Sequence, residues 1–192
     1  MFWIAAETGM RGGELCGLFA DDVDLANRLI YVRRSAWRGK LQTPKTSNAV
    51  RHFPISPNLA QHIQEHLAGR TSGLLFHTRN GKPYDNYNVV TWQLKPLLTK
   101  VGIQGDAAKG MGLHAFRHGN ASALDSVGAP VRVRMDRLGH ADSEMTLGYT
   151  HAVSEDHRRV ADEMGRIFDP SLPKLSVTDR NVRTPLLNSV GA

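Results

Sequence analysis

The chain of 192 residues has a single cysteine, few aromatic residues and no long apolar run. Because Cys16 has no partner, no disulfide can form within the chain, and with no signal-like start this favours a reducing, cytoplasmic compartment. A membrane-spanning helix needs about 18 consecutive apolar residues, and the sequence contains no such run. These features exclude a disulfide-stapled secreted module and a protein anchored by transmembrane helices.

The composition is that of an ordinary globular protein, with 41% hydrophobic and 22% charged residues. The length suits one well-buried domain, with or without a tail. Lys and Arg outnumber Asp and Glu by 24 to 18, and the formal charge of +6 fits attraction to a polyanion such as nucleic acid. Charge alone leaves two alternatives open, which are general solubility and binding to a membrane surface.

Alternating apolar and polar residues predict a small sheet after a first helix that begins at the start of the chain. The helix runs through the apolar residues up to Thr8 and has no N-cap before it, so we expect the natural chain to begin earlier. The predicted strands are Arg28 to Ser35, Leu41 to Pro44 and Val50 to Ile55. Together they would form a three-stranded antiparallel sheet near the N-terminus.

The rest of the chain has helical periodicity interrupted by Gly and Pro. The predicted helices are Pro57 to Leu67 (closed by Gly69), Tyr87 to Val101, His114 to Val127, Val131 to Leu138, Ser143 to Tyr149 and Ser154 to Phe168. The fold class is therefore α+β and mostly helical. Periodicity fades after Asp169, so we expect residues 170–192 to form a mobile tail, although Leu186 and Leu187 could dock.

Residues of types that can carry chemistry stand in several separate motifs. His114 and Arg117 are three apart, so a helix would place them on one face. His140 ends one predicted helix in Leu-Gly-His, and Tyr149 ends the next, so the two could converge. Further pieces are Thr-Gly-Met-Arg-Gly-Gly-Glu-Leu with Arg11, and Thr-Pro-Lys-Thr with Lys45 in the hairpin.

These motifs resemble those of the tyrosine recombinase, or phage integrase, family across about Phe2 to Phe168. The family's first arginine motif, TGxRxxEL, matches TGMRGGEL, and its HxxR box matches HAFR. Its LGH motif and its TxxYTH motif are also present, in the family's order. The resemblance implies six catalytic residues, which are Arg11, Lys45, His114, Arg117, His140 and Tyr149.

The resemblance implies a site-specific recombinase or integrase catalytic domain, in which Tyr149 attacks a DNA phosphodiester and forms a 3′-phosphotyrosyl intermediate. Arg11 and Arg117 would bind the nonbridging oxygens, because planar guanidinium groups hold their charge and present paired donors. His114 would be the base for the phenol, while Lys45 would protonate the departing 5′ oxygen. His140 would hydrogen-bond the phosphate, and Glu14 would support Arg11 through an i,i+3 pair. No metal, ATP or other cofactor is expected.

The resemblance also implies partners and domain organisation. The partner would be double-stranded DNA, bound by a chain that is monomeric in solution and forms a homotetramer on paired sites when full length. Residues 1–169 would be the catalytic domain, without its first helix and without the family's N-terminal DNA-binding domain. The tail of residues 170–192 would be mobile or would dock in trans on a neighbouring subunit. The expected location is the cytoplasm of a prokaryotic cell or of a phage-infected host.

Basic residues around the hairpin are candidates for contacts with the DNA backbone, with an ordinary solvated surface charge as the alternative for each. They are Arg33, Arg34, Arg38, Lys40 and Arg51.

Three other functions are alternatives to a recombinase. His62, Glu65 and His66 form an HxxEH pattern that is also found in zinc peptidases, but no third ligand is indicated and a polar helix face explains it better. A type IB topoisomerase, which nicks and reseals DNA with a similar residue set, is a second alternative. The third is an inactive DNA-binding fragment of a recombinase.

Overall fold

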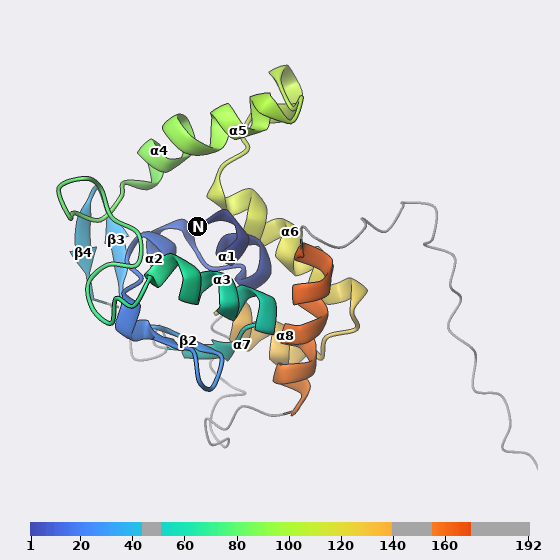
Figure 1. Ribbon diagram of the computed structural model, residues 1–192. Helices are drawn as coiled ribbons and strands as arrows, with labels where there is room; N and C mark the ends of the chain where they lie inside the picture. The colour runs from blue at the N-terminus through green and yellow to red at the C-terminus, as the bar shows by residue number, and fades with distance from the viewer. Residues whose placement is uncertain (44–50, 140–154, 170–192) are drawn as a thin grey trace, which may run out of the picture.

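The computed structural model describes residues 1–43, 51–139 and 155–169. The helical elements are α1 (Phe2–Thr8), α2 (Gly12–Cys16), η1 (Ala20–Asp22), α3 (Pro57–Leu67), α4 (Asn86–Val89), η3 (Val90–Leu94), α5 (Lys95–Lys100), η4 (Gly105–Ala108), α6 (Leu113–Ser126), α7 (Val131–Leu138) and α8 (Glu155–Phe168). The strands are β1 (Val23–Asp24), β2 (Leu29–Val32), β3 (Ser35–Trp37), β4 (Lys40–Gln42) and β5 (Arg51–Pro54). The predicted α+β, mostly helical class is confirmed (Figure 1).

The strands form a three-stranded antiparallel sheet, as predicted, but one member of it, β1, is not a predicted strand and takes the place of the segment Leu41 to Pro44. The order is β1-β2-β5, with Ile30 opposite Phe53 at its centre. The segment predicted to form a strand at Leu41 to Pro44 instead contributes β4, which among the described strands pairs with β3 alone. The cause is a two-residue turn at Arg38 and Gly39, whose φ angles of 49° and 69° are those of a tight hairpin.

Most predicted helices are present with ends that follow from local chemistry. In α3 the Ser56 hydroxyl accepts a hydrogen bond from the Leu59 N–H at 3.2 Å, and Pro57 occupies the first turn. The helix ends at Leu67, as predicted; its C-cap is Ala68, followed by the predicted Gly69, and both residues have positive φ angles. The helix predicted at Ser143 to Tyr149 lies outside the described residues.

The long helix predicted at Tyr87 to Val101 is interrupted. A π-helical segment, η3, separates α4 from α5, and the Lys95 N–H bonds to the carbonyl of Val90, five residues earlier. Pro96 follows directly, and a proline inside a helix removes one N–H and displaces the carbonyl four residues before it. This helical stretch projects from the body of the molecule (Figure 1), and Tyr87 and Trp92 on it are exposed.

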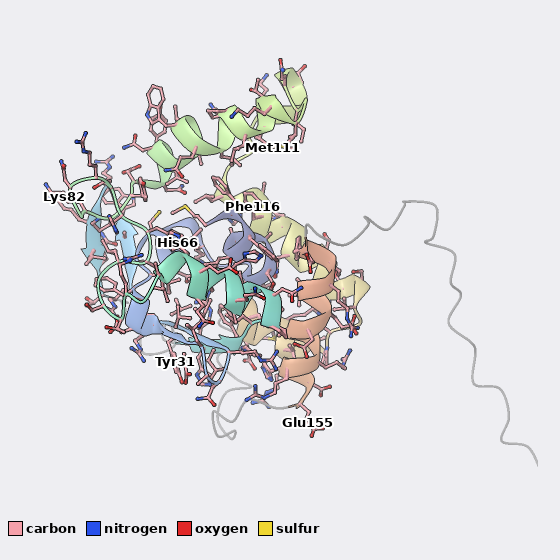
Figure 2. All side chains as sticks on the ribbon, in the orientation of Figure 1. Tyr31, His66, Lys82, Met111, Phe116 and Glu155 are labelled. Carbon is pink, nitrogen blue, oxygen red and sulfur yellow. The ribbon has the colours of Figure 1, made fainter. Side chains whose placement is uncertain are left out.

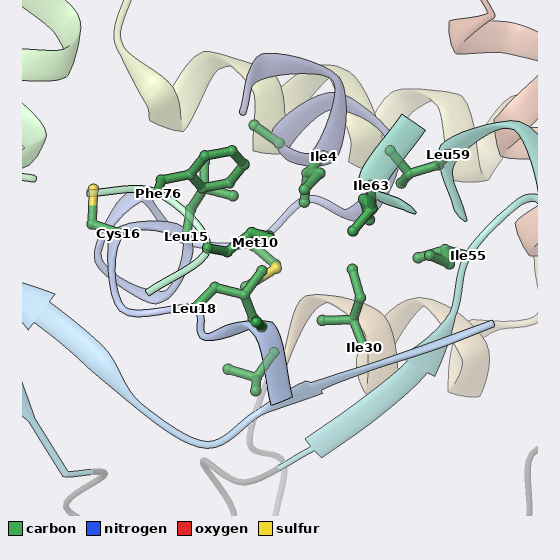
Figure 3. Close-up of a cluster of buried hydrophobic side chains, with 14 of the residues drawn as sticks. Ile4, Met10, Leu15, Cys16, Leu18, Ile30, Ile55, Leu59, Ile63 and Phe76 are labelled. Atoms are coloured by element: carbon green, nitrogen blue, oxygen red, sulfur yellow. The ribbon is translucent and has the colours of Figure 1, made fainter. Parts of the chain in front are cut away.

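The main core joins α1, α2 and α3 to the buried face of the sheet, where Ile30 and Phe53 lie, with Ile55 directly after β5. Figure 3 shows Ile30 and Ile55 in this core. A second cluster, centred on Leu124 and Val160, is shared by α6, α7 and α8. Helix α1 contacts both α6 and α8, so it connects the two clusters. Cys16 is fully buried, and burial raises the pKa of its thiol to about 11, with the charge of Asp85 adding to the effect. No helix among the described residues is long and apolar enough to cross a membrane.

Candidate active site

Arg11 stands at the N-cap of α2, immediately after a tight turn that ends α1. Gly9 closes α1 with a φ of 65°, and a β-carbon there would lie 2.7 Å from Oδ1 of Asn120. The turn is held from inside by the Thr8 hydroxyl, which donates to the Ile4 carbonyl at 2.6 Å. Thr8 and Gly9 therefore close α1, Met10 turns into the core, and Arg11 follows with a side chain that is 50% exposed.

Glu14 supports Arg11 in the way predicted and in one further way, and it also binds Arg51. Its Oε2 accepts from the Arg11 backbone N–H at 2.8 Å, and its Oε1 accepts from Nη1 of Arg11 at 3.2 Å. The same carboxylate receives Nη1 and Nη2 of Arg51 at 2.9 and 2.8 Å. Burial alone would raise the pKa of Glu14, but the hydrogen bonds and charge of Arg51, with those of Arg11, hold it below its usual value.

Arg117 lies on α6 and is 6% exposed. Its Nη1 donates to the Gly9 carbonyl at 2.9 Å, and its Nη2 donates to the Leu138 carbonyl. Burial lowers the pKa of this guanidinium, and the positive charge of Arg11 lowers it further. The two predicted phosphate-binding arginines lie near one another, because Arg117 donates to the Leu138 carbonyl and Arg11 to that of the next residue, Gly139.

His114 lies on the same helix as Arg117 but in a different environment. Its ring is exposed and meets the ring of His118 edge-on, with 4.6 Å between the centroids. The predicted helix therefore exists, but the shared face does not give the two side chains a shared environment, since one faces the protein and the other faces solvent. Phe116, between them in sequence, stacks on Phe2 of α1 and anchors this turn of α6 (Figure 2).

Three guanidinium groups meet at the C-terminal end of α7. Arg51 donates its Nε to the Arg137 carbonyl at 3.4 Å, Arg117 donates to the Leu138 carbonyl, and Arg11 donates its Nη2 to the Gly139 carbonyl at 3.1 Å. The last carbonyls of a helix have no partner within it and carry the negative end of its dipole. Arginines are therefore suited to this place. We call Arg11, Glu14, Arg51 and Arg117 the arginine cluster.

The arginine cluster contains two of the six predicted catalytic residues, Arg11 and Arg117. His140 follows Gly139 in sequence, but His140, Lys45 and Tyr149 lie outside the described residues. Gly139 has a φ of 63°, and a β-carbon there would meet Cζ of Arg51 at 2.9 Å. The glycine of the Leu-Gly-His motif is therefore required both by its left-handed backbone and by the closeness of Arg51.

The five candidate DNA-backbone residues have three kinds of environment. Arg38 and Lys40 are exposed on the β3–β4 hairpin, where the Arg38 guanidinium lies 4.4 Å from the centre of the Trp37 ring. Arg33 and Arg34 pair with Asp22 at 3.4 and 2.9 Å. Arg33 also lies over the Tyr31 ring, labelled in Figure 2.

Arg51 has the third kind of environment, which does not suit the predicted contact to the DNA backbone. Its side chain is only 10% exposed, and both of its terminal nitrogens are engaged by Glu14. Arg51 pairs with Val32 at one end of β5, and from this position its side chain reaches Glu14 of α2.

Arg137 and Glu7 are two charged residues that were not identified from the sequence. Both are completely buried. Arg137 donates to the Pro54 carbonyl at 3.0 Å and to the Glu7 carbonyl at 3.2 Å. Burial lowers the pKa of Arg137 to about 10, against the attraction of Glu7. Burial raises the pKa of Glu7, although its carboxylate accepts from the N–H and the hydroxyl of Ser56, both at 2.8 Å. A sequence signal existed, because Arg137 lies four residues after Val133 on the buried face of α7.

The two histidines of the HxxEH pattern have different partners. His62 packs its ring against Trp3, with 4.3 Å between centroids, and its Nδ1 lies 3.2 Å from Glu65. His66 places Nε2 3.0 Å from the Leu75 carbonyl. Across residues 1–43, 51–139 and 155–169, no group of three or more potential ligands is arranged to hold a metal ion.

Comparison with known proteins gives consistent matches. The model of the phage integrase family matches residues 1–156. A putative prophage phiRv2 integrase of Mycobacterium tuberculosis is 32% identical over 86% of this chain and 45% of its own length. The tyrosine recombinase XerD of Lacticaseibacillus casei is 30% identical over 82% of this chain and 50% of its own. The chain thus spans about half the length of these relatives.

The solved structures agree. The Tn1549 transposon integrase in complex with circular intermediate DNA superposes with a TM-score of 0.62 at 26% identity, covering 82% of this chain and 56% of that one.

Proposed function

Since the chain belongs to the phage integrase family, we propose that it is the catalytic domain of a site-specific DNA recombinase that cuts and rejoins DNA through a tyrosine nucleophile. The observation that carries the proposal is the position of Arg11 and Arg117, which both reach the carbonyl groups at the end of α7. The names of the relatives are those of integrases and recombinases, so the topoisomerase alternative is not favoured.

The two arginines suit the charge that develops in the reaction. Attack on a phosphodiester leads to a five-coordinate phosphorus whose nonbridging oxygens carry negative charge. Arg11, half exposed, has nitrogens available to a DNA phosphate, while Arg117 is held firmly by two carbonyl groups. A guanidinium fixed in advance needs little reorganisation when the charge appears.

Tyr149 is the proposed nucleophile. Its phenolic oxygen forms a bond to phosphorus as the bond from phosphorus to the 5′ oxygen breaks, which leaves a 3′-phosphotyrosyl link. A phenol has a reference pKa of about 10, so its proton must be taken up, and His114 is the proposed acceptor. Lys45 is the proposed donor of a proton to the departing 5′ oxygen, and His140 the proposed hydrogen-bond donor to the phosphate.

The 3′-phosphotyrosyl link retains the phosphodiester bond energy. A 5′ hydroxyl of another strand can attack it, restore the tyrosine and reseal the DNA without ATP or a metal. We assign residues 1–169 to this catalytic domain and residues 170–192 to a tail that is mobile or docks on a neighbouring subunit. The proposed location is the cytoplasm of a prokaryotic cell or a phage-infected host.

The proposed partner is double-stranded DNA, in line with the net charge of +6. Arg38 and Lys40 on the β3–β4 hairpin are the proposed backbone contacts, because their side chains are exposed. We propose a monomer in solution that assembles as a homotetramer on paired sites when full length. The affinity for DNA should fall steeply as salt rises, since each neutralised phosphate releases counterions.

The decisive experiment uses a nicked DNA substrate that loses a short fragment after cleavage, so that the covalent intermediate accumulates. The chain is expected to form a protein–DNA adduct that survives denaturing electrophoresis, and Tyr149→Phe is expected to form none while binding DNA equally well. Intact DNA binding with no adduct from the unsubstituted chain would overturn the proposed activity. Relaxation of supercoiled plasmid without recombined products would point to the topoisomerase alternative.

A further inference from the structure

Arg51 links two parts of the candidate active site. Its Nη1 and Nη2 donate to the two carboxylate oxygens of Glu14 at 2.9 and 2.8 Å, a paired geometry that a planar guanidinium suits best. Its third nitrogen, Nε, donates to the Arg137 carbonyl at 3.4 Å. The side chain is 10% exposed, so these contacts are made largely out of water.

The two parts that Arg51 joins each lead to a proposed catalytic residue. On one side, Glu14 holds both the backbone N–H and the Nη1 of Arg11. On the other side, Cζ of Arg51 lies 2.9 Å from the position that a β-carbon on Gly139 would take. Gly139 is the residue before His140 in the chain. One buried side chain therefore touches the support of Arg11 and the turn that precedes His140.

We propose that Arg51 is a positioning residue for phosphoryl transfer, which sets the placement of Arg11 relative to the end of α7. This inference rests on the proposed function. Arg51 acts through Glu14 and does not touch the reacting phosphate. By engaging both carboxylate oxygens, Arg51 neutralises Glu14 and leaves Nη2 of Arg11 directed to the Gly139 carbonyl.

The consequence of losing Arg51 follows from the charge of Glu14. Without Arg51, the buried carboxylate would have Arg11 as its remaining cationic partner among the contacts described. The guanidinium of Arg11 would then be drawn toward Glu14 and away from a bound phosphate, because a buried anion binds its nearest cation strongly. Cleavage should slow while DNA affinity, which depends on many surface charges, should change little.

The test measures single-turnover cleavage by the 192-residue chain and its Arg51→Met variant on two DNA substrates. One substrate has a natural phosphodiester at the cleavage site, and the other has a methylphosphonate, which lacks the charged nonbridging oxygen. Arg51→Met is expected to cleave the natural substrate about 10²-fold more slowly, since misplacing a charge-stabilising group costs about this much. On the methylphosphonate the deficit relative to the unsubstituted chain should shrink to about threefold or less, because less charge needs to be stabilised.

Two further variants separate positioning from folding. Arg28→Met removes an ion pair of similar length, 2.9 Å to Asp162, in which neither residue belongs to the arginine cluster. This variant should cleave both substrates at the unsubstituted rate. Arg51→Lys keeps the charge but cannot engage both oxygens of Glu14 and the Arg137 carbonyl. It should fold normally and still favour the methylphosphonate, with about a tenfold deficit on the natural substrate, so it carries the test if Arg51→Met fails to fold.

Four results would overturn the proposal. Unchanged cleavage by both Arg51 variants would show that Arg51 is not needed. An equal deficit on both substrates would indicate a structural role alone. Weaker DNA binding with a shallower salt dependence would make Arg51 a phosphate contact. No adduct from the unsubstituted chain would overturn the proposed function, and this inference with it, whereas the first three results leave the proposed function standing.

Discussion

Two groups of charged residues lie at the C-terminal end of α7: the arginine cluster, which binds its last carbonyl groups, and Arg137 of the helix itself with Glu7. The arginine cluster leaves Arg11 half exposed, so part of its charge faces solvent. The group of Arg137 with Glu7, which we call the Arg137 site, is fully buried, and Arg137 donates to the backbone carbonyls of Pro54 and Glu7. One group is open to a ligand and the other is closed. We infer that the arginine cluster serves chemistry and that the Arg137 site serves stability.

The largest effect is expected from Arg117→Lys, which tests the functional half of this comparison. A lysine cannot reach the Gly9 and Leu138 carbonyls with a planar fork and also face a phosphate. The rate of adduct formation at saturating DNA should fall about 10³-fold, the upper range for loss of one preorganised donor. The fraction folded, measured by circular dichroism, should remain near that of the unsubstituted chain at low temperature. A rate within threefold of the unsubstituted chain would break the assignment of chemistry to this cluster.

Arg137→Met tests the other half and should act on stability. It removes two donors from buried carbonyl groups and the positive charge nearest Glu7, and removing one partner of a buried charged group costs about 3 kcal/mol or more. Urea unfolding followed by fluorescence gives the free energy of unfolding. The rate of adduct formation per folded molecule should stay unchanged. If that rate falls as much as in Arg117→Lys while stability holds, the two groups are not divided as we infer.

The smallest effect is a difference in pH dependence between Glu14 and Glu7. The pKa of Glu14 is lowered in the folded chain, so its contribution to stability is present above the unfolded value of about 4.3 and is lost as pH falls through the folded pKa. The pKa of Glu7 is raised by burial, so stability instead rises as pH falls through its folded pKa toward about 4.3.

The measurement is the free energy of unfolding from pH 7 to pH 3 for the unsubstituted chain, Glu14→Gln and Glu7→Gln. The deficit of Glu14→Gln should be largest at neutral pH and should shrink on acidification. Glu7→Gln should lose the gain that the unsubstituted chain shows on acidification. Parallel curves for all three proteins would mean that folding shifts the pKa of neither carboxyl group.

Local sequence was sufficient to predict most of the described helices and to identify the motifs of Arg11 and Arg117. Helix α3 has its serine cap, its proline and its left-handed end in consecutive residues, so its bounds could be predicted closely. The Arg11 and Arg117 motifs could be identified because their residues are fixed by local turns and by helix spacing. The pairing of Arg11 with Glu14, one turn apart, was likewise predictable and is confirmed at 3.2 Å.

Contacts between distant residues could not be predicted in this way. The segment Leu41 to Pro44 was wrongly assigned to the three-stranded sheet, because the two-residue turn at Arg38 and Gly39 pairs β4 with β3 instead. Arg51 looked like one more surface charge, since nothing near it in sequence shows that Glu14, 37 positions away, would engage it.

By itself, the sequence determined where most of the described helices lie and which motifs match those of the family, because caps, turns and side-chain periodicity act over a few neighbouring positions. Only the tertiary structure decided that Arg11, Arg51 and Arg117 meet at the carbonyl end of α7 and that Arg137 lies buried beside Glu7. The physical reason is that a buried charge takes its partner from whatever segment packs against it. That choice depends on chain folding over tens of residues and leaves no periodic pattern in the sequence.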